Sequence, residues 1–122
     1  MRDGTAERRA QLYREASELI QREYGSELSL EAVARRLATS RRQLQRAFAE
    51  AGSTFRDELA DVRMGHARRL LAARELPVRA VAISVGYQQP AQFAKSFKRH
   101  HGEPPSTFRR RAQAEGLAAE AA

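Results

Sequence analysis

The chain carries one short pattern twice. LPVRAVAISVGY at residues 76–87 repeats the apolar register of LSLEAVARRLAT at residues 28–39. If the turn of the second copy is allowed one extra residue, the apolar positions that follow also correspond, Phe93 to Leu44 and Phe97 to Phe48. Further on, the tetrapeptide Ser106-Thr107-Phe108-Arg109 repeats Ser53-Thr54-Phe55-Arg56. Chance would not also preserve a core register, so we interpret the chain as two copies of one helical unit.

The first copy has the pattern of a helix-turn-helix. Ser29 is placed to cap a short helix, and Ala38-Thr39-Ser40 is a tight turn whose serine caps a second helix over residues 41–51. On that second helix an apolar face alternates with a polar one at helical spacing. We expect the core face to hold Leu44, Ala47 and Phe48, and the opposite face to hold Arg42, Gln45, Arg46 and Ala49.

The second copy is punctuated by proline and glycine. We expect Pro77 to start its first helix, Gly86 to end that helix in a left-handed turn, and Pro90 to start the second helix. Gly102 then stops the second helix and Pro105 opens a last one, on which Phe108 packs inward. On the second helix Phe93 and Phe97 face the core, while Ala91, Lys95 and Lys98 lie opposite.

A longer helix is predicted between the copies, over residues 55–74, with Ser53 and Thr54 as N-cap candidates. One apolar stripe is expected along it, made of Phe55, Leu59, Val62, His66, Leu70 and the stem of Arg74. Such a helix is roughly 30 Å long. It can hold two DNA-reading helices about 34 Å apart, which is one turn of the duplex.

A further helix is expected before the first copy, over residues 5–24. Thr5 is its predicted cap, Gly25 its predicted left-handed end, and its buried stripe is Leu12, Ala16, Leu19 and Ile20. The fold class is therefore all-α, with two helix-turn-helix subdomains joined by a long central helix. We divide the chain into an N-terminal helix with the first unit (1–52), a connecting helix (53–75), the second unit with the final helix (76–111) and a frayed tail (112–122).

The net charge of +7 is concentrated in the two units. Residues 76–111 carry seven basic residues against one acid, and residues 31–50 carry five against two. Only Lys95 and Lys98 of the 22 basic residues are lysine, and arginine is the better residue for bidentate contacts to phosphate and guanine. No apolar run reaches the ~18 residues of a membrane span, so a cytoplasmic location is expected.

Other classes of function find little support. There is no Cys, so a thiol nucleophile and a Cys-ligated zinc are excluded. His100 and His101 point apart on one helix, and His66 falls on an apolar stripe, so we expect no catalytic residue, no metal site and no cofactor. A cationic membrane-surface helix would need one long helix with a wide apolar face, whereas the basic residues here follow turns on short helices.

The stretch GYQQPAQFAKSFKRHHGEPPSTFRR resembles the signature of the AraC/XylS-type transcription regulators. That signature has a Gly-aromatic turn, a Phe-x-x-x-Phe-Lys helix, and then Gly, Pro, an aromatic residue and Arg. The matching residues are Gly86, Tyr87, Phe93, Phe97, Lys98, Gly102, Pro105, Phe108 and Arg109. Upstream, the stretch from Leu30 to Phe48 also matches, as do Arg63, Ala67, Leu70 and Leu71. The resemblance extends over about residues 8–111.

The resemblance implies a regulator that inserts two reading helices into successive major grooves of double-stranded DNA. Because the two reading helices on the chain are unequal, we expect it to bind DNA as a monomer. The resemblance also implies activation of transcription and contact with RNA polymerase. By position, the base contacts fall on Arg42, Gln45, Arg46, Ala91, Gln92 and Lys95, and the phosphate contacts that we expect beside them are Ser40, Arg41, Gln89, Lys98 and Arg109. Ala91 is shorter than the polar residue common in the family, and Gln89 stands where the family often has a capping Ser.

Alternatives remain open from the residues alone. The chain can be the output domain of a longer ligand-sensing regulator. An RNA-binding or protein-docking helical module is a further alternative, which binding to duplex DNA against structured RNA distinguishes.

Overall fold

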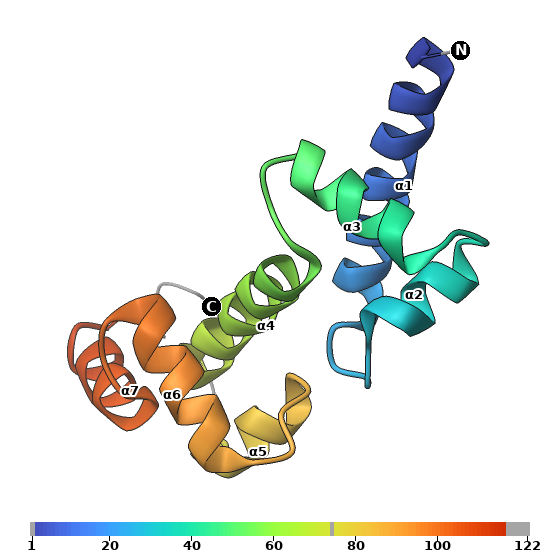
Figure 1. Cartoon of the computed structure of the whole chain (residues 1–122). Helices are drawn as coiled ribbons and strands as arrows, with labels where there is room; N and C mark the ends of the chain where they lie inside the picture. The colour runs from blue at the N-terminus through green and yellow to red at the C-terminus, as the bar shows by residue number, and fades with distance from the viewer. Residues whose placement is uncertain (1, 74, 117–122) are drawn as a thin grey trace. The chain divides into compact units, whose positions relative to one another are not determined.

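The structure, a computed structural model, describes residues 2–73 and 75–116, with the backbone alone for residues 2–4. In this part of the chain there are seven α-helices and no strand, as the sequence predicted (Figure 1). The chain divides into two compact units, Met1–Leu59 and Ala60–Ala122, and the division falls within the helix α4 (Phe55–Ala73).

Unit 1 consists of α1 (Arg2–Glu23), α2 (Leu30–Arg36), α3 (Arg41–Glu50) and the start of α4. Helices α1 and α3 lie side by side (Figure 1). The core contains the predicted residues of α1 and α3, together with residues of α2 and α4: Leu12, Ala16, Leu19, Ile20, Val33, Ala34, Leu44, Ala47, Phe48 and Leu59.

The predicted start of α1 is wrong, and Gly25 after its end is not left-handed. The helix already begins at Arg2, so Thr5 lies inside it and does not cap it. The helix stops at Glu23, and Gly25 does not adopt a positive φ. Ser26 explains this end, because its backbone N–H and its hydroxyl both donate to the Glu23 carbonyl, at 2.9 and 2.7 Å. A carbonyl satisfied in this way needs no left-handed glycine.

The caps around the first turn are those that the sequence predicted. The Ser29 hydroxyl accepts from the Ala32 N–H and the Ser40 hydroxyl from the Gln43 N–H, both at 3.1 Å. Thr54 rather than Ser53 caps α4, since its Oγ1 accepts from the Asp57 N–H at 3.0 Å.

Unit 2 consists of the rest of α4 with α5 (Val78–Ser84), α6 (Pro90–His101) and α7 (Pro105–Ala114). Helix α6 contacts both α5 and α7 (Figure 1). Pro90 and Pro105 begin their helices as predicted, and Gly102 ends α6 with a φ of 82°. Pro77 is the residue before α5 and not its first residue. The core is aromatic at its centre and lined by aliphatic side chains: Phe93, Phe97, Phe108, Met64, Ala67, Leu71, Val81, Ala82, Val85 and Ala112.

The internal duplication is visible in the backbone of the two turns. In unit 1 the N–H of Thr39 donates to the carbonyl of Ala34, and in unit 2 the N–H of Tyr87 donates to that of Ala82, both at 2.9 Å. The residue before each donor has a positive φ, 54° at Ala38 and 104° at Gly86. The paired phenylalanines also repeat, because Phe48 meets Phe55 edge to face at 5.9 Å and Phe97 meets Phe108 at 5.6 Å.

The single apolar stripe predicted along α4 is wrong. Leu59 is buried as expected, but Val62, His66 and Leu70 are only partly covered, and Arg74 lies outside the described residues. In unit 2 the buried residues of α4 follow another register, Met64, Ala67 and Leu71. Residues of α4 therefore pack into the cores of both units, and the set that is buried differs between the two units.

The last helix continues beyond the predicted boundary at residue 111. It ends at Ala114, and Ala112 within it is fully buried. Of the segment 112–122 that the sequence marked as a tail, residues 117–122 lie outside the described residues.

Candidate nucleic-acid interface

Helix α3 presents the polar face that the sequence assigned to it. Arg42, Gln45 and Arg46 are exposed, while Leu44 and Phe48 on the other face are buried to 1% exposure or less. Ser40, which caps this helix, and Arg41 lie at its start and are also exposed. The five predicted contact residues of unit 1 therefore lie on or beside the accessible face of one rigid helix.

The cations of this face differ in their partners. Arg41 lies 3.4 Å from Glu31, with both side chains more than half exposed, a pair that solvent weakens. Among the residues that the structure describes, no carboxylate forms an ion pair with Arg42 or Arg46. Glu50 near Arg46 is held by Arg9 at 2.7 Å, and this hydrogen bond is the main reason why the pKa of Glu50 is lowered.

An aromatic and carboxylate cluster that sequence analysis did not predict fixes the back of α3. Phe48 lies edge to face between Tyr13, at 5.2 Å, and Phe55, at 5.9 Å. The hydroxyls of Tyr13 and Ser17 donate to the two carboxylate oxygens of Glu58, at 2.7 and 2.6 Å. The bond to Glu58 raises the pKa of Tyr13. The sequence showed Glu58 only as an acid near a helix start.

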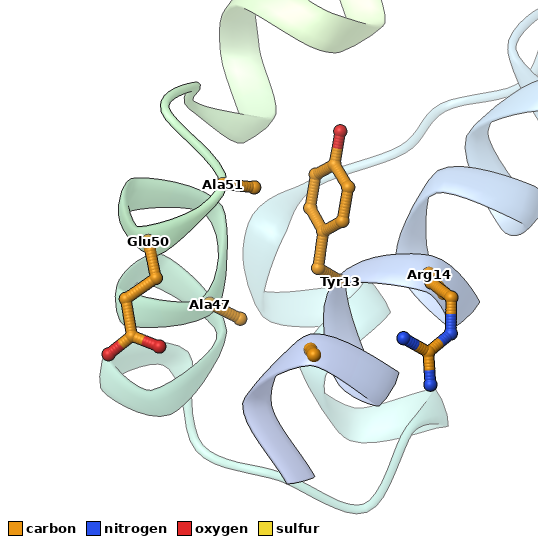
Figure 2. A pocket seen from close by; sticks show the side chains of 6 residues that line it. Tyr13, Arg14, Ala47, Glu50 and Ala51 are labelled. Atoms are coloured by element: carbon orange, nitrogen blue, oxygen red, sulfur yellow. The ribbon is translucent and has the colours of Figure 1, made fainter. Parts of the chain in front are cut away.

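A pocket of about 270 Å³ lies between α1 and α3. Figure 2 shows Ala47 of α3 and Ala51, the residue after α3, facing Tyr13 of α1, with Arg14 and Glu50 at the edges. Small alanines let the two helices approach closely here. The pocket lies on the side of α3 that packs on α1, so it is part of the packing between these two helices and not of the exposed face of α3.

Helix α6 presents a shorter and less polar face in unit 2. Ala91, Gln92, Lys95 and Lys98 are exposed, as is Gln89 before the helix, while Phe93, Ser96 and Phe97 are buried. The start of α6 has no side-chain hydrogen bond from its cap residue Gln89, in contrast to α3. The charges of this face belong to lysines, which act as point charges without the planar fork of arginine.

Two histidines hold α6 to α4. His100 Nε2 lies 2.9 Å from Asp61 Oδ1, and His101 Nε2 lies 3.2 Å from the carbonyl of Met64. The His101 ring also packs on Phe97, with the ring centroids 4.5 Å apart. The sequence showed correctly that these rings diverge, but it gave no sign that each has a separate anchor on α4.

Arg109 is placed differently from the other predicted contacts. It is partly buried on α7, and its Nε donates to the Leu71 carbonyl at 3.2 Å. This bond satisfies a carbonyl in the last turn of α4, where a cation is favourable. Its neighbour Arg111 is paired with Glu103 at 2.6 Å, which lowers the pKa of Glu103.

The geometry of each unit defines a class of protein. A short helix, a left-handed turn and a second helix that is fixed by its buried face and exposes polar side chains form the helix-turn-helix of DNA-binding proteins. Within the described ranges, no cluster of three or more His, Cys, Asp or Glu is arranged to hold a metal ion. None of the helices described there combines the length and the apolar content of a bilayer-spanning segment.

Comparisons with known proteins identify the family within this class. A family model described as a helix-turn-helix domain matches residues 33–111. The chain is 40% identical over 81 residues to the HTH-type transcriptional regulator GlxA of Rhizobium meliloti, and this match covers 66% of the chain and 25% of that regulator. The chain belongs to the AraC/XylS-type family of DNA-binding transcription regulators.

Solved structures agree with this assignment. The C-terminal domain of AraT, a response regulator from Geobacillus stearothermophilus, is similar with a TM-score of 0.79 and 36% identity, covering 81% of this chain and 84% of that one. The DNA-binding domain of AdpA in complex with a target DNA has a TM-score of 0.79 and 27% identity, covering 84% of this chain and 94% of that one.

The curated relatives are longer proteins. The chain spans 25% of the GlxA regulator, 36% of the Msm operon regulatory protein of Streptococcus mutans and 24% of the ornithine utilization regulator of Pseudomonas aeruginosa.

Proposed function

We propose that the chain binds duplex DNA sequence-specifically by inserting α3 and α6 into successive major grooves. The observation that supports this proposal is the arrangement of the second helix in each helix-turn-helix, which exposes one polar face and buries the opposite face in the core of its unit. A helix held in this way keeps its side chains in a fixed register toward base edges. The AdpA neighbour, which was solved with its target DNA, supports the same use of the fold.

In unit 1 we assign base contacts to Arg42, Gln45 and Arg46. Arginine makes bidentate contacts to guanine and glutamine makes them to adenine. Arg42 and Arg46 form no ion pair with any residue that the structure describes, which leaves their guanidinium groups available to DNA. Ser40 and Arg41 at the helix start are assigned to phosphates, because the N-terminus of a helix attracts anions. The exposed Arg41–Glu31 pair can open at little cost.

In unit 2 we assign a larger share of the contacts to the DNA backbone. Ala91, Gln92 and Lys95 take the base-contacting positions, but only Gln92 and Lys95 carry groups that hydrogen-bond base edges. Gln89 and Lys98 are assigned to phosphates. Arg109, whose Nε donates to the Leu71 carbonyl, is also kept as a phosphate contact.

We also propose how the chain acts on transcription. We assign the chain to activation of transcription through contact with RNA polymerase, as a monomer on DNA, in the cytoplasm and without an enzymatic activity. The alternative is that this chain is the output part of a longer, ligand-sensing regulator, and the curated relatives support this alternative through their greater length alone. RNA binding and protein docking remain the competing functions.

A salt titration tests the proposed function. The protein is titrated onto a duplex selected from a random pool, onto a scrambled duplex and onto a structured RNA of equal length, at several salt concentrations. We expect the selected duplex to bind most tightly, with affinity falling linearly in log–log form as salt rises. Binding to the RNA as tight as to the selected duplex would contradict DNA as the ligand.

A further inference from the structure

Arg63 lies directly against the turn that joins α5 to α6. A Cβ atom added to Gly86 would lie only 2.8 Å from the Nε, Cζ and Nη2 atoms of Arg63. The backbone of the turn therefore rests on the guanidinium group of a residue that belongs to α4. Gly86 also has a φ of 104°, so the absence of a side chain serves both the left-handed turn and the close approach of Arg63.

The contact continues from Arg63 into α6. Its Cζ lies over the Tyr87 ring, 5.5 Å from the centroid, which is within cation–π distance. The Tyr87 hydroxyl lies 2.9 Å from the hydroxyl of Ser96, which is 8% exposed, and the Tyr87 ring packs against Phe93 at 5.6 Å. A chain of contacts thus runs from α4 through the turn to the middle of α6. Burial of Arg63 lowers its pKa, in keeping with its position inside the unit.

The first unit fixes its second helix by other means. Ser40 caps α3 with its own hydroxyl, whereas Gln89 gives no side-chain bond to the start of α6. Ala38 occupies the position that corresponds to Gly86, and its Cβ is tolerated there. The start of α6 thus lacks the local cap present at α3, and the contact of Arg63 with the turn is an alternative restraint.

We propose that Arg63 is a positioning residue, which fixes the direction of the exposed face of α6 and so sets the base preference of the half-site that α6 reads. This inference rests on the proposed function. Arg63 acts through Tyr87 and Ser96 and does not contact the nucleic acid itself.

The test compares four variants with the wild type. Arg63→Met removes both the charge and the flat guanidinium group, whereas Arg63→Lys keeps the charge and loses the guanidinium group. Tyr87→Phe removes only the hydroxyl that lies against Ser96. Arg56→Met is the matched control, since Arg56 is an exposed arginine of the same helix.

The first readout needs no DNA. Amide hydrogen exchange is measured at Tyr87 and Phe93, whose N–H groups donate to Ala82 and Gln89, and at Leu44 in unit 1 as an internal reference. We expect Arg63→Met to raise exchange at the first two amides by about tenfold and to leave Leu44 unchanged. Arg63→Lys and Tyr87→Phe are expected to show smaller increases, and Arg56→Met none.

The second readout is base discrimination. Each variant is titrated onto the selected duplex and onto duplexes in which one half-site is replaced. We expect Arg63→Met to lose about tenfold in discrimination at the α6 half-site and to keep that at the α3 half-site. Equal losses at both half-sites, or unchanged exchange with unchanged discrimination, would overturn the proposal.

Two further outcomes are decisive. If Arg63→Met loses its helical structure, Tyr87→Phe becomes the deciding variant, and normal exchange at Phe93 with normal discrimination in that variant would overturn the inference. If the wild type shows no base preference at either half-site, the proposed function fails, while the exchange at Tyr87 and Phe93 still shows whether Arg63 positions the turn.

Discussion

Arginines in unit 1 differ in what their guanidinium groups contact, and this difference separates structural cations from those available to a ligand. Arg36 forms two hydrogen bonds with Glu23, at 2.6 and 2.8 Å, and this pairing lowers the pKa of Glu23. Arg9 is paired with Glu50 through a single hydrogen bond of 2.7 Å. Arg42 and Arg46 have no such partner in the described part of the chain and lie on the exposed face of α3. Charge alone does not distinguish these four residues.

Arg46→Ala is expected to weaken binding to the best site by about 1–3 kcal/mol and to relax the base preference of one half-site. Lys98→Ala should weaken all sequences alike and reduce the slope of log affinity against log salt by about one. The measurement is binding of both variants to the selected and the scrambled duplex at several salt concentrations. Arg36→Ala is the control, with base preference unchanged because Arg36 is held by Glu23. If Arg46→Ala loses equally on both duplexes, Arg46 contacts only phosphate.

His66 gives unit 2 a pH dependence of known sign. Its burial, and secondly the nearby Arg69, lower its pKa below the ordinary value of 6.5, and Arg69 lies 2.7 Å from its Nδ1. The folded state therefore favours the neutral ring. The associated stability is complete above pH 6.5 and is lost as the pH falls from there through the lower folded value.

We expect His66→Gln to flatten this part of the stability profile. The measurement is urea unfolding of both proteins between about pH 5 and 7.5, the range in which histidine titrates. Parallel profiles for the wild type and His66→Gln would show that His66 does not contribute.

Buried phenylalanines fix both second helices: Phe48 on α3, and Phe93 and Phe97 on α6. Phe48 is 1% exposed and Phe97 fully buried, and each meets the edge or face of another phenylalanine. Replacing either by Ala removes a large apolar side chain from a small core.

Phe48→Ala and Phe97→Ala are each expected to cost about 3–5 kcal/mol of unfolding free energy. Thermal and urea unfolding followed by circular dichroism measures this cost. Ile83→Ala is the control, because Ile83 is 58% exposed and its loss should change stability by about 0.5 kcal/mol or less. Variants of Phe48 and Phe97 that unfold together with the wild type would contradict their assignment to the cores.

Much of the helix and turn structure could be predicted from local signals in the sequence. Ser29, Ser40, Thr54, Gly86 and Gly102 each act within a few residues of chain, so their capping and turn roles were predictable from composition and spacing. The register of α4 was not, since it depends on which face each separate core covers. The hydrogen bonds from Tyr13 to Glu58, between His100 and Asp61, and from Arg109 to Leu71 join elements far apart in the chain, where no periodic pattern signals a partner.

At the scale of the whole molecule, two similar units with unequal exposed faces on α3 and α6 lie on one chain. The predicted division assigned residues 53–75 to a separate connector, whereas the structure assigns the start of α4 to unit 1 and the rest to unit 2. A separate connecting role for residues 53–75 stays a prediction. Two unequal faces on one chain have no reason to read identical half-sites, so we expect a non-palindromic site bound by a monomer.

Hydroxyl-radical footprinting of the selected duplex, titrated to stoichiometric saturation, tests whether one chain binds a non-palindromic site. We predict two unequal protected patches on one face of the duplex, about 10–10.5 base pairs apart, that saturate together at one chain per duplex. A symmetric footprint that requires two chains per site would contradict the account.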